Sequence, residues 1–185
     1  MYLSNKIIYL KKLTLKYVSS FKSLFNDPEM CRYLSIPYPL NDKWIKDYIG
    51  DSMEMYNQEE KYTWGIFRHS LDDLVGVAVI KDIDSKNRVA RIGYSTGKKF
   101  WNNSYTIMTV RLILDYAFRK LNLNRIEVRI ETDDQRSMKL LNEIGAIQEG
   151  LMRQAVYYND TFKDLYLYSI LKNDYYNKLE EKMKR

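Results

Sequence analysis

The sequence is poor in the residues that form cross-links and metal centres. It contains one cysteine, Cys31, and one histidine, His69, among 185 residues. A single cysteine excludes an internal disulfide and a site with several thiolate ligands, and it is typical of a protein from a reducing compartment. We therefore interpret Cys31 as a packing residue and His69, at a predicted strand end, as a surface residue.

Long apolar runs are also missing. No stretch approaches the roughly 18 apolar residues that a membrane-spanning helix needs. Residues 1–13 lack both the apolar core and the small-residue cleavage site of a secretory signal. We therefore expect a cytoplasmic protein that has no membrane segment.

Blocks of one charge are missing as well. The formal net charge is +6 and the pI is near 9.1, but the basic residues are scattered among acidic ones. The 17 tyrosines are not interleaved with basic residues, as they would be in a platform for single-stranded nucleic acid. Only the net charge favours RNA or ribosome association, so we do not predict nucleic-acid binding.

Acidic residues occur in pairs at Asp72 and Asp73 and at Asp82 and Asp84. Both pairs flank predicted turns, where aspartate is common because it hydrogen-bonds to the local backbone. We therefore predict no metal site.

The remaining composition is that of an ordinary globular domain, with 45% hydrophobic and 29% charged residues. We find no linker, repeat or low-complexity segment, so residues 1–185 are expected to form one domain. In the first half, Asn41 or Asp42 can cap a helix, and residues 35–40, with two prolines, are predicted to be a loop. Apolar spacing predicts helices at 16–25 and 41–57 and strands at 7–13, 62–68, 74–81 and 88–94, the last three forming an antiparallel meander.

The second half alternates strand and helix. Residues 92–118 are predicted to form a strand, a loop and a long amphipathic helix. A loop at a helix N-terminus presents unpaired N–H groups at the positive end of the helix dipole, so it can hold a diphosphate. The following elements are predicted to be a strand at 124–132, a helix at 135–144, a hairpin of 146–157 and 161–171, and a short surface helix in the tail 174–185.

Several short motifs occur in a characteristic order along this half. They are Arg91-Ile92-Gly93-Tyr94, Trp101-Asn102-Asn103-Ser104-Tyr105-Thr106, Asp115-Tyr116-Ala117-Phe118, Asn124-Arg125-Ile126-Glu127, Asp134-Gln135-Arg136-Ser137, Ile144-Gly145-Ala146 with Glu149-Gly150, and the strand 165–171. Together with the order of elements they resemble the GNAT superfamily of acetyl-coenzyme A dependent N-acetyltransferases, in the branch that acetylates ribosomal-protein N-termini (RimJ/RimL-like). The resemblance covers nearly the whole chain.

The resemblance implies an α+β fold in which helices flank a mixed, mostly antiparallel sheet whose strands splay at the cofactor cleft. It implies direct transfer of an acetyl group from acetyl-coenzyme A to a primary amine, on a protein N-terminus or a small molecule. It is also compatible with a homodimer. The alternative is a noncatalytic binding or regulatory domain with a degenerate cofactor loop.

The resemblance also implies which residues contact the cofactor. The family usually has glycine where this chain has Asn102 and Ser104, and glycine or alanine at Thr106, since small residues let the backbone approach phosphate. Lys98 and Lys99 can pair with phosphates or form a solvated basic turn. The implied cofactor contacts are Ile92, Tyr94, Ser95, Lys98, Lys99, Trp101, Asn102, Asn103, Ser104, Tyr105, Thr106, Asp134 and Ser137.

For catalysis the amine must lose a proton and the departing thiolate must gain one. Ser137 matches the serine that the branch places near the thioester sulfur, and its alternative role is to cap a helix. The base is not evident, because Arg91 stands where the branch often has glutamate. Tyr94 is ranked first as a substitute, ahead of Asp82, Asp84 and Glu127, although such a tyrosine can also merely line the pocket.

The acceptor is expected to enter beside residues 26–44 and the final hairpin. The aromatic residues there can form a wall of the acceptor site or belong to the core. These substrate-side candidates are Tyr33, Tyr38, Trp44 and Tyr157, with Tyr158 beside them.

Overall fold

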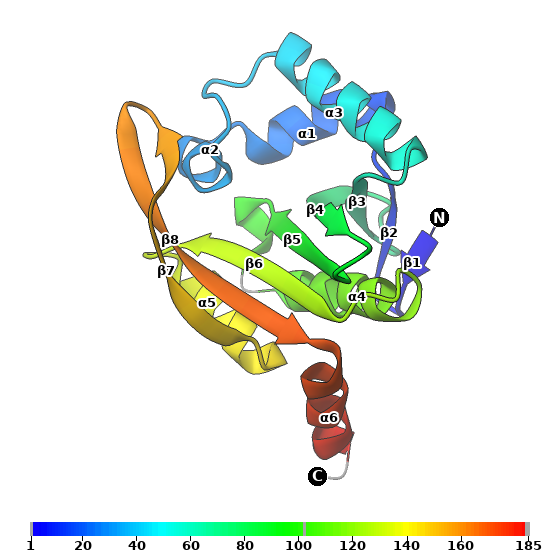
Figure 1. Ribbon diagram of the computed structural model, residues 1–185. Helices are drawn as coiled ribbons and strands as arrows, with labels where there is room; N and C mark the ends of the chain where they lie inside the picture. Colours follow the sequence, from blue (N-terminus) through cyan, green and yellow to red (C-terminus); the bar gives the residue numbers. More distant parts are fainter. Residues whose placement is uncertain (1, 102, 184–185) are drawn as a thin grey trace. The chain divides into compact units, whose positions relative to one another are not determined.

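The computed structural model describes residues 2–101 and 103–183, and the strands form one sheet of mixed direction (Figure 1). Hydrogen bonds order these strands as β1-β2-β3-β4-β5-β6-β8-β7. The chain forms two compact units, one of residues 1–82 and 93–116 and the other of residues 83–92 and 117–185. Strands β4 (Leu74–Asp84) and β5 (Val89–Thr96) run through both units.

The first unit contains an antiparallel set of strands and most of the helices. β1 pairs with β2, β2 with β3, and β3 with β4, all antiparallel. Helices α1 and α3 contact each other, and α3 also contacts β3 (Figure 1). The elements of this unit, besides parts of β4 and β5, are β1 (Tyr2–Ser4), β2 (Ile8–Lys12), η1 (Leu15–Tyr17), α1 (Val18–Phe25), α2 (Pro28–Leu34), α3 (Asp42–Asn57), β3 (Tyr62–Arg68), η2 (Lys98–Phe100) and most of α4 (Tyr105–Arg119).

Local sequence explains where the helices of the first unit begin. The carboxylate of Asp27 accepts hydrogen bonds from the N–H groups of Glu29 and Met30, and Pro28 fixes the first helical position of α2. The side chain of Asn41 accepts from Trp44 N at 2.8 Å and caps α3, which confirms one of the two predicted caps. Helix α1 buries Val18, Phe21, Leu24 and Phe25 at the spacing of one helical face.

The second unit contains a parallel pair of strands. β5 pairs in parallel with β6 (Arg125–Glu131) over residues 89–91 and 125–127. β6 pairs antiparallel with β8 (Thr161–Leu171), which pairs antiparallel with β7 (Ile147–Tyr158). Helices α5 (Gln135–Ile144) and α6 (Lys172–Met183) complete the unit.

On β6, one face belongs to the core and the other is polar. Ile126, Val128 and Ile130 are buried, whereas the alternate residues from Arg125 to Glu131 are all charged. This is the strand periodicity that the sequence predicts. We call the second set, which consists of Arg125, Glu127, Arg129 and Glu131, the polar face of β6.

The predicted α+β fold and its mixed, mostly antiparallel sheet are confirmed. Several short elements were not predicted, among them β1 and α2. β1 has only three residues, and the residues Asn26-Asp27-Pro28, a combination that is also typical of a turn, lead into the short helix α2. Cys31 is fully buried and its Sγ donates to Phe25 O at 3.3 Å, as expected of a packing residue.

Within the described part of the chain, none of the helices has the length and apolar character that crossing a membrane requires.

Candidate active site

Backbone hydrogen bonds hold the loop between β5 and α4. Gly97 N donates to Val75 O at 2.9 Å, which ties the start of the loop to β4. Phe100 N then donates to Gly97 O at 2.7 Å in the short helix η2. The backbone N and side-chain Nδ2 of Asn103 both donate to Phe100 O, at 3.3 and 3.4 Å. The loop therefore holds its shape through its own hydrogen bonds.

Helix α4 begins directly after this loop. Its ladder starts with the hydrogen bond from Met108 N to Ser104 O, at 3.0 Å. The N–H groups of Tyr105, Thr106 and Ile107 therefore lie ahead of the first helical bond, at the positive end of a helix of 15 residues. N–H groups in this position can bind an anion such as a diphosphate.

The structure describes two of the three positions where the family has small residues, and their surroundings differ. Ser104 is exposed, and none of the described residues in the loop has a positive φ, so Ser104 meets no backbone conformation that would require glycine. The hydroxyl of Thr106 lies 3.1 Å from that of Thr96, so this β-branched side chain ties the helix to the end of β5. Asn102 lies outside the described residues. As far as it is described, the loop is compatible with a bound diphosphate.

The two lysines of the loop have different surroundings. The ammonium of Lys98 pairs with Glu29 at 2.7 Å and with Asp27 at 3.4 Å, and these carboxylates raise its pKa. Lys99 is exposed, and its Nζ lies 5.0 Å from the ring centroid of Phe100. To contact a phosphate, Lys98 would have to exchange its bonds at the start of α2, so a cofactor role for Lys98 stays a prediction.

Trp101 links the loop to the end of β5. Trp101 Nε1 donates to Thr96 O at 3.0 Å. Ser95 and Tyr94 are partly buried and Ile92 is buried. A Cβ on Gly76 would meet Ser95 O at 2.3 Å, so the backbones of β4 and β5 approach closely here. The proposed backbone contacts of β5 with a cofactor stay predictions.

Asp134 and Ser137 belong to the second unit, where they form the start of α5. The carboxylate of Asp134 accepts from Ser137 N at 3.0 Å, so Asp134 is the N-cap. Asp134, and not Ser137, therefore caps α5. The hydroxyl of Ser137 is not needed to begin the helix. Ser137 is partly buried, and its catalytic role stays a prediction.

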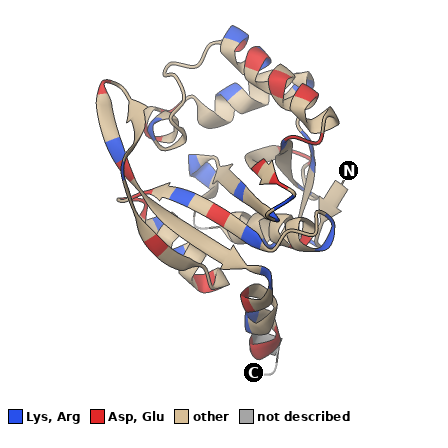
Figure 2. Cartoon of the chain, viewed as in Figure 1, with Lys and Arg blue, Asp and Glu red and all other residues tan. Residues whose placement is uncertain are grey.

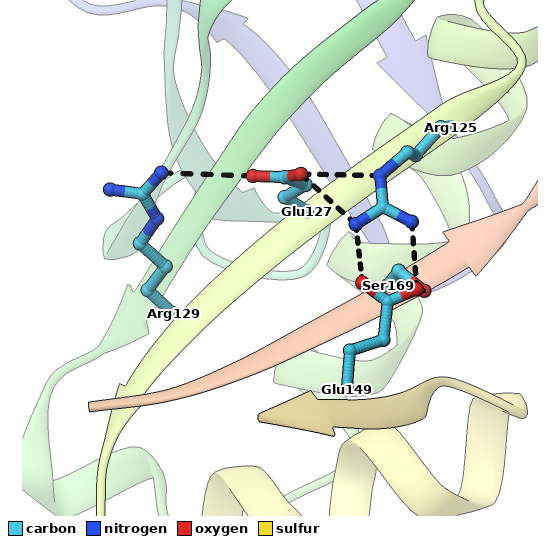
Figure 3. A network of polar contacts seen from close by, with 5 residues as sticks. All are labelled: Arg125, Glu127, Arg129, Glu149 and Ser169. Atoms are coloured by element: carbon cyan, nitrogen blue, oxygen red, sulfur yellow. Dashed lines mark hydrogen bonds and ion pairs between the residues drawn. The ribbon is translucent and has the colours of Figure 1, made fainter. Parts of the chain in front are cut away.

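Among the substitute bases, Glu127 is held by two guanidinium groups (Figure 3). Arg125 donates to Glu127 Oε1 from Nε at 3.2 Å and from Nη2 at 3.0 Å, and Arg129 Nη2 lies 3.7 Å from Oε2. Arg125 also binds Glu149, whose Oε1 accepts from Ser169 Oγ at 2.7 Å. The carboxylate of Glu127 is thus part of a surface network of charges.

The other candidate bases lie on strands and turns. Asp82 is exposed with a φ of 53°, and Asp84 accepts from Asn87 N and Nδ2 at 2.8 and 2.7 Å. These bonds lower the pKa of Asp84. Tyr94 is partly buried on β5. In the described residues no group of three or more His, Cys, Asp or Glu side chains is arranged to hold a metal ion.

The aromatic residues predicted for the acceptor site contact different partners. Trp44 stacks on Tyr48, with ring centroids 5.4 Å apart, and Arg32 lies over the ring of Tyr33 at 4.2 Å. Tyr38 is 53% exposed. In the second unit, Tyr157 is exposed, packs on Phe162 at 4.9 Å and donates to Asp160 at 3.0 Å. Their role at an acceptor site stays a prediction.

One pair of residues was not identified from the sequence. Lys163 Nζ donates to Glu131 Oε1 at 2.6 Å, and the side chains are only 17% and 9% exposed. The strand pattern places Glu131 on the polar face of β6, but alternation alone does not tell which of four charged residues is buried.

Comparison with known proteins now identifies the class. The family described as "Acetyltransferase (GNAT) domain" matches residues 8–147. This chain therefore belongs to the GNAT acetyltransferases, and it is an N-acetyltransferase with acetyl-coenzyme A as its acetyl donor.

Particular relatives support the branch. The uncharacterized N-acetyltransferase p20 of Bacillus licheniformis is 30% identical over 166 residues, which are 90% of this chain and 93% of p20. The ribosomal-protein-serine acetyltransferase of Escherichia coli is 26% identical over 98 residues, 53% of this chain and 55% of that protein. Another relative is named for acting on spermidine.

Solved structures share the fold. RimL, a ribosomal L7/L12 α-N-protein acetyltransferase solved in complex with coenzyme A, superimposes with a TM-score of 0.84 at 18% identity, covering 92% of this chain and 98% of RimL. The comparisons thus favour an enzyme over the noncatalytic binding domain considered from the sequence.

Proposed function

We propose that this protein transfers the acetyl group of acetyl-coenzyme A directly to the N-terminal amine of a polypeptide. The observation that carries the proposal is the family match over residues 8–147 together with a loop whose following helix has its first N–H groups ahead of the hydrogen bond from Met108 N to Ser104 O. We propose that the chain works as a single N-acetyltransferase domain in the cytoplasm. A homodimer is compatible with this function.

In this proposal the residues divide by role. The backbone of β5 from Ile92 to Ser95 and the loop ahead of α4 hold the donor. The hydroxyl of Ser137 protonates the departing thiolate. This hydroxyl is not needed as the N-cap of α5, because Asp134 caps that helix. Tyr94 lines the reacting centre.

The net charge favours a polypeptide acceptor over a polyamine. At +6 the protein repels a polycation, whereas the N-terminus of a protein brings one ammonium group and a variable remainder. The relative from Escherichia coli is named for acting on a ribosomal protein. We therefore expect peptides with acidic residues after the N-terminus to be preferred over spermidine.

The test measures free thiol from acetyl-coenzyme A with three acceptors: an acidic peptide with a free N-terminus, the same peptide with its N-terminus blocked, and spermidine. We expect thiol release only with the first, and a gain of one acetyl group in the mass of that peptide. Release with spermidine alone would overturn the acceptor class. No release with any amine and no thermal stabilisation by millimolar acetyl-coenzyme A would overturn the function itself.

A further inference from the structure

Phe100 anchors the loop between β5 and α4. The short helix η2 in this loop contains basic residues and no acidic one (Figure 2). Its lysines, Lys98 and Lys99, are exposed, whereas Phe100 is only 6% exposed. The backbone of Phe100 binds the loop on both sides, since its N–H donates to Gly97 O and its carbonyl accepts from Asn103 N. A side chain that fixes the ring of Phe100 therefore also fixes the loop.

Arg68, the last residue of β3, holds its guanidinium over this ring. Its Cζ lies 5.1 Å from the ring centroid of Phe100, within the range of a cation–π contact. The ring of Tyr105, the first residue of α4, meets that of Phe100 at 68°, with the centroids 6.1 Å apart. Asp73, and after it the side chain of Tyr105, raises the pKa of Arg68. Arg68 thus interacts with both ends of the loop, and all four residues belong to the first unit.

Asp73 fixes the orientation of the Arg68 guanidinium. Arg68 Nε donates to Asp73 Oδ1 at 2.7 Å and Nη2 donates to Oδ2, so the pair is bidentate. Two parallel hydrogen bonds of this kind set the plane of the guanidinium as well as its position. The two side chains are 23% and 35% exposed, and an ion pair that water reaches contributes little to stability. The geometry of the pair therefore matters more than its contribution to the free energy of unfolding.

Orientation matters for a loop that binds an anion through its backbone. The first N–H groups of α4 bind a diphosphate well only if they already point toward it before it arrives. A loop that must become ordered on binding loses affinity, because each immobilised side chain costs free energy. A fixed ring of Phe100 removes part of this cost.

We propose that Arg68 is a positioning residue of the donor site. Held by Asp73, its guanidinium fixes Phe100 and Tyr105, and through them the loop that receives the diphosphate of acetyl-coenzyme A. This inference rests on the proposed function, in which that loop holds the donor. Arg68 acts through the two rings and makes no contact with the phosphates itself. It therefore affects the binding of the donor, and it leaves acceptor binding and the chemical step unchanged.

The experiment measures steady-state kinetics and, by calorimetry, the Kd of coenzyme A for Arg68→Met. This variant keeps an apolar side chain but loses the charge and the planar fork. We expect the donor KM and the Kd to rise about 5- to 10-fold, because the loop must then become ordered on binding. We expect kcat at saturating donor and the acceptor KM to stay at the wild-type values. A merely structural role would reduce the folded fraction, which lowers kcat and changes neither KM.

Asp73→Asn is the second variant, and it decides the question if Arg68→Met does not fold. It keeps the volume of the side chain but replaces charge-assisted hydrogen bonds by weaker neutral ones. We expect the donor KM to rise about threefold, again with kcat unchanged.

The matched control is Lys11→Met. Lys11 makes the same two kinds of contact with neighbouring residues, since its Nζ lies 3.1 Å from Asp72 Oδ1 and 4.2 Å from the ring centroid of Phe67. The variant removes a cation from the same turn but from no ring of the loop, so we expect its donor KM to stay within about twofold of wild type.

Two results would overturn the inference while the proposed function would stand. One is a donor KM within twofold of wild type in the folded variants of Arg68 and Asp73. The other is an equal rise of the donor KM in Lys11→Met. A wild-type protein that neither binds coenzyme A nor acetylates an amine would remove both the inference and the proposed function.

Discussion

The two ends of β6 make the same kind of interaction in different surroundings. At its start, Arg125 binds Glu127 and Glu149, and the three side chains are 22–37% exposed. At its end, Glu131 binds Lys163 with side chains 9% and 17% exposed. At each end a carboxylate on the polar face of β6 contacts a cationic side chain. The comparison therefore shows the effect of solvent exposure on such an ion pair.

Solvent exposure determines how much each ion pair contributes to the stability of the fold. Exposed pairs contribute about 0–1 kcal/mol, because solvent screens them and the side chains lose rotamer freedom. A buried pair contributes little as a whole, but removing one partner leaves an uncompensated charge. The start of β6 is thus expected to tolerate change, and the end is expected to be sensitive to any change that breaks its charge balance.

The largest expected effect on stability is at the buried end. Lys163→Met removes the ammonium that contacts the buried carboxylate of Glu131 at 2.6 Å, so we expect the free energy of unfolding to fall by about 3 kcal/mol. Urea unfolding measures it, with Lys120→Met, an exposed lysine, as a control within about 0.5 kcal/mol. Equal values for the two variants would contradict the assignment of a buried pair.

A smaller effect is expected at the exposed end. Arg125→Met removes the partner of both Glu127 and Glu149, but water solvates these carboxylates, so we expect a loss of only about 1 kcal/mol. The same urea experiment measures it. A loss as large as that of Lys163→Met would show that exposure does not separate the two ends, and the comparison would fail.

Most of the fold could be predicted from the sequence. The alternation of apolar residues in strands and their spacing in helices follow from which face of each element is buried. The strand 62–68 and the helix 135–144 have the predicted bounds. The elements that were missed are short: α2 has seven residues and begins at a proline that also signals a turn. Such a segment lacks the length for a periodic pattern.

The candidate site was less predictable because its residues are defined by partners far along the chain. The motif order indicated the loop ahead of α4 and Ser137. Neither the pair of Lys98 with Glu29 nor that of Lys163 with Glu131 has a sequence signal, since the partners are 69 and 32 residues apart. A buried carboxylate becomes recognisable only when the burial of each strand residue is known.

The smallest expected effect concerns pH. Arg125 and Ser169 lower the pKa of Glu149 from 4.5 to about 2. Because the pKa is lower in the folded protein, the stabilisation is fully present above pH 4.5 and is lost as the pH falls toward 2. Glu149 is 37% exposed, so the contribution is below about 1 kcal/mol. Unfolding free energies of wild type and Glu149→Gln should therefore differ at pH 6 and converge near pH 2. A constant difference over this range would mean that Arg125 does not hold this carboxylate in solution.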